Sequence, residues 1–268
     1  MKVRIDITLP LGHKARMFSD PALAAALSLE TLTIVWLGGF LGGMASGAAG
    51  FAFGVVATSI WLHAISPLHA AMLVVSGGLI VQAGLVVKMR RALDWPRLAP
   101  FLIAGLIGIP IGVALVVTTA AATIRFAVAI FLAFYGLYAL MAPRLPHVSG
   151  GGKAADAVIG FFGGILGGLG GFSGILPAIW TQLRGWPKDA ARGVYQPFIV
   201  VAHVTALLLI GIVALDRIGV ALFVAMLPAV ALGGWVGWMI YGKLDERRFQ
   251  QMFAGLLVVS GLLLLVRI

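Results

Sequence analysis

A glycine-rich phrase that occurs twice within apolar sequence constrains the fold of this chain more than any other feature. The first copy reads GGFLGGMASGAAGFAFG at 38–54, and the second reads IGFFGGILGGLGGFSG at 159–174. Glycine in a helix interior costs about 1 kcal/mol relative to alanine, so two such dense stretches need a reason. In membrane transporters, helices broken at corresponding positions of two repeats form the substrate site near the bilayer midplane. We therefore expect two broken helices with a site between them.

The composition is typical of an integral membrane protein. Of the 268 residues, 61% are hydrophobic and 10% are charged, whereas about a quarter of the residues in a soluble domain are charged. Ten apolar segments follow one another, five in each half. They lie near 31–48, 51–64, 69–88, 97–118, 124–142, 157–170, 172–183, 190–211, 217–240 and 248–267. Since a spanning helix needs about 20 apolar residues, we predict an all-α polytopic integral membrane protein.

The segments group into two repeats of about five helical segments each. We divide the chain into a basic N-terminal tail (1–28), a first membrane repeat (29–142), a linker (143–155) and a second membrane repeat (156–268). The second segment of each repeat is too short to cross a bilayer at 1.5 Å per residue. The first two segments of each repeat are therefore expected to be broken or re-entrant.

The placement of Lys and Arg predicts that the two repeats have opposite orientations. Basic residues crowd two connections, one after the third segment of the first repeat and one before the third segment of the second repeat. They are Lys88, Arg90, Arg91 and Arg97 in the first, and Arg184, Lys188 and Arg192 in the second. Because Lys and Arg mark the cytoplasmic side, equivalent connections lie on opposite sides, which predicts inverted-topology repeats. The basic tail would then lie outside, so the side of the N-terminus stays open.

The net charge and the cysteine content limit the classes of partner and cofactor that the chain is expected to bind. The formal net charge is +10, but the basic residues stand in connections that face lipid headgroups. We expect contacts with membrane lipids and none with nucleic acid. The chain has no cysteine, which excludes disulfides and thiolate metal sites. We expect no metal site and no cofactor, apart from a coupling proton or sodium ion.

Polar residues in and near the glycine phrases predict an anion site. All nine Asp and Glu residues fall in the tail, the connections or the segment ends, so no carboxylate is expected at mid-membrane, where cation and proton sites often place one. Backbone N–H groups at helix N-termini bind anions, and unwound glycines let a ligand approach the backbone. The predicted binding residues are Ser46, Ala49, Gly50, Gly168, Gly170, Gly171, Ser173, Gly174, Gln196 and His203. The alternative is that the glycines serve close helix packing, as in GxxxG interfaces.

His203 is the most deeply placed ionisable side chain of the sequence. Ionisable groups inside a membrane segment are costly and point to function, and an imidazole can carry a proton or donate to an anion. The alternative is a neutral histidine that bonds to a neighbouring helix. Gln196 shares one helix face with His203. Secondary candidates are Arg184, Arg192, Tyr195 and Gln82.

The second glycine phrase and the text after it resemble the TauE/SafE family of sulfite and organosulfonate exporters. The similar text is GGLGGFSGILPAIWTQLRGWPKD and then RGVYQPF, and the resemblance extends over about 31–268. The first copy departs from the pattern, because AAGFAFG replaces the glycine triplet and no proline matches Pro177. The resemblance implies a secondary transporter of the bacterial cytoplasmic membrane that moves sulfite, sulfonates or small carboxylates by alternating access.

Two other classes of function stay open beside transport. One is an integral-membrane enzyme, although neither HExxH nor GxSxG occurs in the sequence. The other is an assembly or scaffold subunit without transport activity. The exact substrate, the direction of transport and the oligomeric state are not predicted, with a homodimer as one alternative.

Overall fold

The computed structural model describes residues 21–89, 93–141, 148–240, 255, 257–259 and 261–266, and every regular element in these ranges is a helix. The helices are α2 (Pro21–Ala26), α3 (Leu29–Ala49), α4 (Phe53–Trp61), α5 (Pro67–Met89), α6 (Trp95–Thr118), α7 (Ala121–Met141), α8 (Gly152–Gly170), α9 (Ile175–Leu183), α10 (Lys188–Ala214) and α11 (Arg217–Ile240). Seven of them are long and apolar enough to cross a membrane. This confirms the predicted all-helical, multi-pass membrane protein. The first 20 residues of the tail and half of the predicted segment 248–267 lie outside the described residues.

The second helix of each repeat is short, in agreement with the prediction. Helices α4 and α9 have nine residues each, which at 1.5 Å per residue is about 14 Å and too short to span a bilayer. Helix α4 folds back along α3, because Gly42 of α3 lies against Ala57 and Gly38 lies against the ring of Trp61. The pair α3–α4 is therefore a helical hairpin, as a re-entrant pair would be.

A helix begins within the predicted linker 143–155. Helix α8 begins at Gly152, so the last part of the predicted linker 143–155 is helical. Gly151 precedes the helix with a φ of 94°, a left-handed conformation that glycine adopts without strain. The boundary expected at 142 lies outside the described residues.

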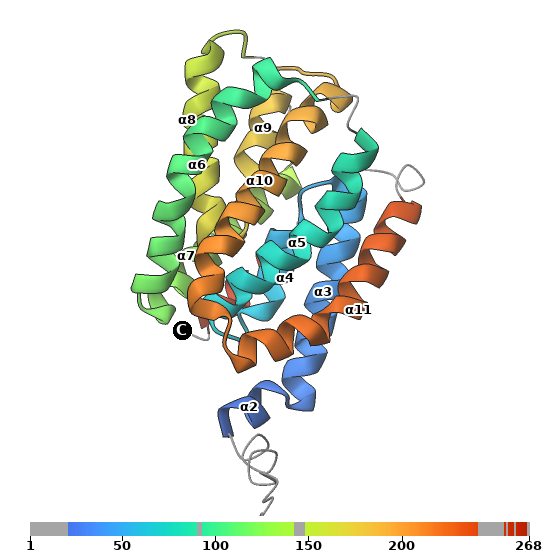
Figure 1. Ribbon diagram of the computed structural model, residues 1–268, viewed down its shortest axis with the longest axis vertical. Coiled ribbons are helices and arrows are strands. Elements are labelled where there is room, and N and C mark those ends of the chain that lie inside the picture. The colour runs from blue at the N-terminus through green and yellow to red at the C-terminus, as the bar shows by residue number, and fades with distance from the viewer. Residues whose placement is uncertain are drawn as a thin grey trace, which may run out of the picture.

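The two repeats use the same pattern of helix partners. Helix α3 packs on α11, α8 packs on α6, and α5 packs on α10. Each pair joins one helix of the first repeat to one helix of the second. In Figure 1, α3 rises from α2 at the lower end, whereas α8 descends from the upper end. This arrangement supports the predicted inversion, which stays a prediction until the two halves are superposed.

Contacts at the two ends of the bundle agree with the predicted distribution of charge. At one end, the guanidinium of Arg97 in the first turn of α6 lies 4.9 Å from the ring centroid of Trp186, just before α10. At the other end, Nε2 of His69 near the start of α5 lies 3.1 Å from Oδ1 of Asp216, just after α10. The connection after α5 therefore lies at the same end as the connection before α10. We call the end that contains Arg97 and Trp186 the basic end.

Asp216 also caps the N-terminus of helix α11, which it directly precedes. Its Oδ1 accepts a hydrogen bond of 2.6 Å from the N–H of Gly219. Partial burial acts to raise the pKa of Asp216, but the N–H of Gly219 and the ring of His69 outweigh it and hold the pKa below its usual range. The carboxylate is thus charged at neutral pH, where it both caps a helix and joins the two repeats.

Glycines at four-residue spacing form close packing seams between the long helices. On α8 these glycines are Gly160, Gly164 and Gly168, and all three face α6. A Cβ at Gly164 would overlap the carbonyl oxygen of Gly105, and one at Gly168 would overlap that of Ile109. The corresponding glycines of α3, which face α11, are Gly39, Gly43 and Gly47. Small residues let two helix backbones approach closely, so the packing interpretation holds for this part of each phrase.

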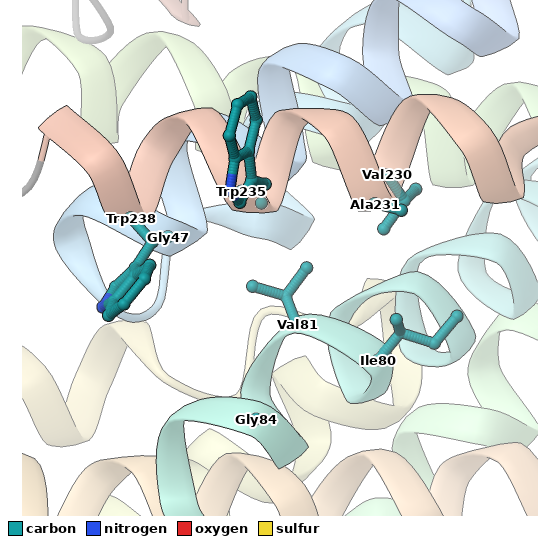
Figure 2. A pocket seen from close by; sticks show the side chains of 9 residues that line it. Gly47, Ile80, Val81, Gly84, Val230, Ala231, Trp235 and Trp238 are labelled. Atoms are coloured by element: carbon teal, nitrogen blue, oxygen red, sulfur yellow. The ribbon is translucent and has the colours of Figure 1, made fainter. Parts of the chain in front are cut away.

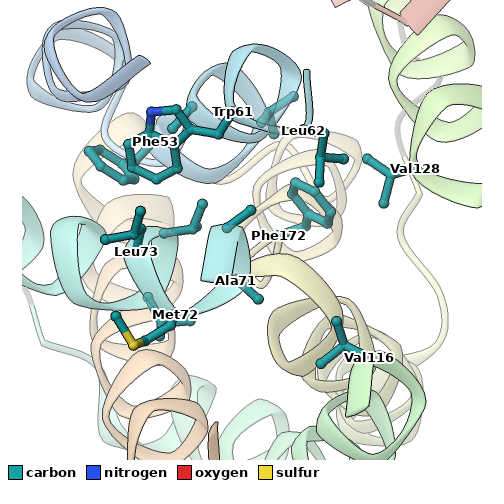
Figure 3. Packing of buried hydrophobic residues seen from close by; sticks show 14 of the residues in the cluster. Phe53, Trp61, Leu62, Ala71, Met72, Leu73, Val116, Val128 and Phe172 are labelled. Carbon is teal, nitrogen blue, oxygen red and sulfur yellow. The ribbon is translucent and has the colours of Figure 1, made fainter. Parts of the chain in front are cut away.

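The apolar core joins the short helices to the helices around them (Figure 3). Phe53 and Trp61 of α4, Leu73 of α5 and Phe172 after α8 are each at most 2% exposed. The indole N–H of Trp61 donates a hydrogen bond of 3.0 Å to the carbonyl oxygen of Val35. Because these side chains come from both repeats, the core holds the two broken regions in one place.

Candidate functional site

Both glycine phrases break the chain in the same way. Gly50 ends α3 with a φ of 89°, and Gly171 ends α8 with a φ of 73°. A left-handed residue at a helix end is usually glycine, because a Cβ is disfavoured there. The next helices, α4 and α9, begin without a side chain that caps them. Their first N–H groups carry partial positive charge and are suited to bind an anion.

The two breaks meet inside the bundle although they are far apart in the sequence. A Cβ placed at Gly54 would lie 2.5 Å from the carbonyl oxygen of Gly171. A Cβ placed at Gly174 would lie 3.0 Å from the Cβ of Phe51. The start of each short helix thus contacts the break of the other repeat, and the two breaks form one region.

A polar side chain holds the carbonyl group at each break. Nε2 of Gln82, on α5, donates a hydrogen bond to the carbonyl oxygen of Gly50. Nε2 of His203, on α10, lies 3.4 Å from the carbonyl oxygen of Gly171. Gln82 and His203 stand at the same distance in sequence as the two glycines, one repeat apart. They therefore occupy equivalent positions, which raises Gln82 from a secondary candidate to the counterpart of His203.

The third helix of each repeat also contacts the break of the other repeat. A Cβ at Gly50 would lie 2.9 Å from Nε2 of Gln196 and 3.4 Å from the hydroxyl oxygen of Tyr195, both on α10. A Cβ at Gly171 would overlap Cγ1 of Val74, on α5. The sequence suggested that the space beside Gly171 admits an anion, but the side chain of Val74 occupies it.

Four buried polar atoms around the breaks have no hydrogen-bond partner among the described residues. They are Oε1 of Gln82, Oε1 of Gln196, Oγ of Ser173 and Nδ1 of His203. All four side chains are at most 2% exposed. Leaving a buried polar group unpaired costs about 1–3 kcal/mol, so such groups are rare unless a ligand or water binds them. This cluster is the strongest indication of a ligand site in the described part of the chain.

The other predicted residues of the glycine phrases lie at or near the breaks. Oγ of Ser46 lies 3.5 Å from Nε2 of Gln82. Ala49 and Gly170 are the last residues of α3 and α8, and Gly174 directly precedes α9. Gly168 is different, because it lies in the seam between α8 and α6, away from the break.

The two arginine candidates lie toward the basic end. Arg184 follows α9, and its Nη1 donates a hydrogen bond of 3.0 Å to the carbonyl oxygen of Gly150. Arg192 is half-buried near the start of α10. Eleven residues separate Arg192 from His203, which is about 16 Å along a helix. Neither arginine belongs to the cluster at the breaks.

Sequence reasoning missed Thr58. This residue of α4 is 3% exposed, and its hydroxyl oxygen also lacks a hydrogen-bond partner among the described residues. A hydroxyl on a predicted re-entrant helix was the available signal. Among the same residues, no group of three His, Asp or Glu side chains could hold a metal ion.

A cavity of about 220 Å³ lies beside the first break, between α3, α5 and α11 (Figure 2). Val81 and Gly84 of α5 line it on one side, and Gly47 of α3 lies with Trp235 and Trp238 of α11 on the other. Its walls are almost entirely apolar, and they lie on helices long enough to span a membrane. None of the four unpartnered atoms of the polar cluster belongs to a residue that lines this cavity, so the two are separate.

Comparison with known proteins identifies one family. The family model described as sulfite exporter TauE/SafE matches residues 35–264. This range contains both glycine phrases, both short helices and the polar cluster between them. Searches of the curated proteins and of the solved structures found no match.

Proposed function

Because the chain belongs to the sulfite exporter TauE/SafE family, we propose that it is a secondary transporter that moves a small anion across the bacterial cytoplasmic membrane. The proposed substrates are sulfite, an organosulfonate or a related oxyanion or carboxylate. Membership in a family of exporters and seven helices of spanning length support transport. An integral-membrane enzyme and an assembly subunit remain the alternative functions.

The unpartnered polar cluster at the two breaks is the observation that carries this proposal. It offers amide, hydroxyl and imidazole groups together with two uncapped helix N-termini. None of these groups has a negative charge, and helix N-termini favour an anion. A hydrogen-bonding site that is buried on all sides would replace the hydration of the anion during transport.

We propose that transport proceeds by alternating access. Helices α5 and α10 pack on each other and carry the buried side chains of Gln82, Gln196 and His203. In our proposal the repeats rock about this central pair, so that the cluster is exposed to one side at a time. The coupling ion is either a proton on His203 or a sodium ion.

Flux measurements in proteoliposomes test the proposal. The purified protein should move at least one anion from a panel of sulfite, sulfate, methanesulfonate and acetate. Ser173→Ala and Gln196→Ala should raise KM about tenfold, because each removes a group from the cluster. Ser76→Ala is the matched control, since its buried hydroxyl already bonds to the carbonyl of Met72 in its own helix. Absence of flux for the whole panel would contradict transport, and equal effects of all three variants would contradict the site.

A further inference from the structure

Arg184 directly follows the C-terminal end of the short helix α9 and lies against two tryptophans. Its Cζ is 5.8 Å from the ring centroid of Trp180 and 5.9 Å from that of Trp186. A guanidinium within about 6 Å of an aromatic face is attracted to it. With the hydrogen bond to the carbonyl of Gly150, these contacts restrict the orientation of a side chain that is otherwise very mobile.

Arg184 forms no ion pair with a carboxylate in the described part of the chain. The ion pairs found there are His69 with Asp216 and Arg97 with Asp94, at 3.1 and 3.2 Å. Asp156, a buried carboxylate of α8, instead accepts a hydrogen bond of 2.7 Å from the indole N–H of Trp180. Arg184 is half-buried and keeps N–H donors beyond the one that Gly150 uses.

Helix α9 connects Arg184 to the central cluster. Its nine residues extend over about 14 Å, and Ser173 lies just before its first turn. The equivalent helix of the first repeat, α4, ends at Trp61, and the connection 62–69 contains neither Lys nor Arg. At the basic end the cation therefore belongs to the connection that directly follows the short helix, whereas at the other end Arg125 of α7 donates a hydrogen bond of 3.2 Å to the carbonyl oxygen of Ile65.

From this geometry we infer that Arg184 is the docking residue at which the substrate first binds, and that it selects anions with two oxygens on one atom. The inference rests on the proposed transport function and adds a recognition step outside the breaks. The planar fork of a guanidinium pairs with two oxygens at once, whereas an ammonium acts as a point charge. Sulfite, sulfonates and carboxylates fit this fork, and a halide ion uses only part of it.

Uptake into everted membrane vesicles tests the inference, because the cytoplasmic face, where Lys and Arg concentrate, then faces the medium. Sulfite, methanesulfonate and acetate serve as probes, with bromide as the competitor. Arg184→Gln should raise KM for the transported probe about tenfold or more and leave kcat within about twofold. Arg184→Lys should keep the dependence of KM on salt but make bromide a relatively stronger competitor.

Arg97→Gln is the matched control. Arg97 also lies over Trp186, but it is exposed and paired with Asp94, so its loss should leave KM unchanged. Trp186→Leu keeps the arginine and removes one aromatic face, so KM should rise about threefold. Thermal unfolding of each variant identifies any loss of folded protein.

Three outcomes are informative. A wild-type KM in Arg184→Gln, with intact flux, would overturn the docking role and leave the proposed transport function standing. Equal increases in Arg184→Gln and Arg97→Gln would also overturn it, because they would indicate a general surface potential. Absence of flux for every probe in the wild type would contradict the transport function itself, and the inference with it.

Discussion

Replacement of Gly171 by alanine tests the left-handed break and the contact between repeats together. Gly171 has a φ of 73°, and its Cβ position overlaps Cγ1 of Val74 from the other repeat. Val74 is fully buried, and a β-branched side chain has little freedom to turn at χ1. The new methyl group therefore meets both an unfavourable backbone conformation and an occupied position.

The two costs can be estimated separately. A residue with a Cβ in the left-handed region loses about 1–2 kcal/mol, and an extra methyl group in a packed core costs about 1–3 kcal/mol. Gly171→Ala should therefore lower the free energy of unfolding by about 2–5 kcal/mol. The same change should reduce transport, because α9 begins just after this break.

A double-mutant cycle with Val74→Ala separates the two costs. Without Cγ1, the nearest remaining atom of residue 74 is its Cβ, 3.2 Å from the new methyl group. In this background Gly171→Ala should cost only the backbone term of about 1–2 kcal/mol. The coupling energy between the two positions should then be about 1–3 kcal/mol. Reversible unfolding in mixed detergent micelles measures all four proteins. Strict additivity would refute the contact, and an unaltered stability of Gly171→Ala would refute the left-handed break.

Three further predictions concern the seams, one end of the bundle and the cluster. Gly164→Ala should destabilise the seam between α6 and α8 by about 1–3 kcal/mol. Gly84→Ala is the control: its new methyl group meets no atom within 4 Å, so it should stabilise α5 by up to about 1 kcal/mol. Equal shifts in Tm for the two variants would contradict the seam. Because the pKa of Asp216 is lowered, its stabilisation is complete at neutral pH and is lost as the pH falls through the folded value. Asp216→Asn should abolish this acid dependence of Tm. The free energy involved is less than about 1 kcal/mol, because the carboxylate is exposed, and an unchanged dependence of Tm on pH in the variant would contradict the role of Asp216. His203→Gln should keep the hydrogen bond to Gly171 and the fold but flatten the pH dependence of substrate binding, as titration calorimetry would show; an unchanged profile would exclude His203 as the proton carrier.

The broken helices could be predicted because glycine marks places where a Cβ does not fit. Gly50 and Gly171 stand at matching places in a repeated phrase, and both have a positive φ. The short segments after them were recognisable from their length alone. The match between Gln82 and His203 was also present in the sequence, because the two residues stand one repeat apart.

The neighbours of each glycine could not be predicted. Gly168 and Gly171 belong to one phrase, yet the first packs on α6 and the second ends the helix. This difference depends on which helix lies alongside, and spacing within one segment carries no such information. Val74 is an apolar residue in an apolar segment, so nothing in its sequence context indicated that it fills the space beside Gly171.

The differences between the repeats indicate where the chemistry lies. The frame is shared, since each repeat has a left-handed glycine, a short helix and a polar side chain that holds a carbonyl group. The polar groups are not shared: the first repeat has Ala52 where the second has Ser173, and Leu62 follows α4 where Arg184 follows α9. Of the two carbonyl-binding side chains, only the imidazole is ionisable. An anion is stabilised by hydroxyl, imidazolium and guanidinium groups, all of which the second repeat supplies. We infer that the second repeat provides recognition and coupling, while the first repeat completes the polar cluster and supplies the counterpart against which the second one moves.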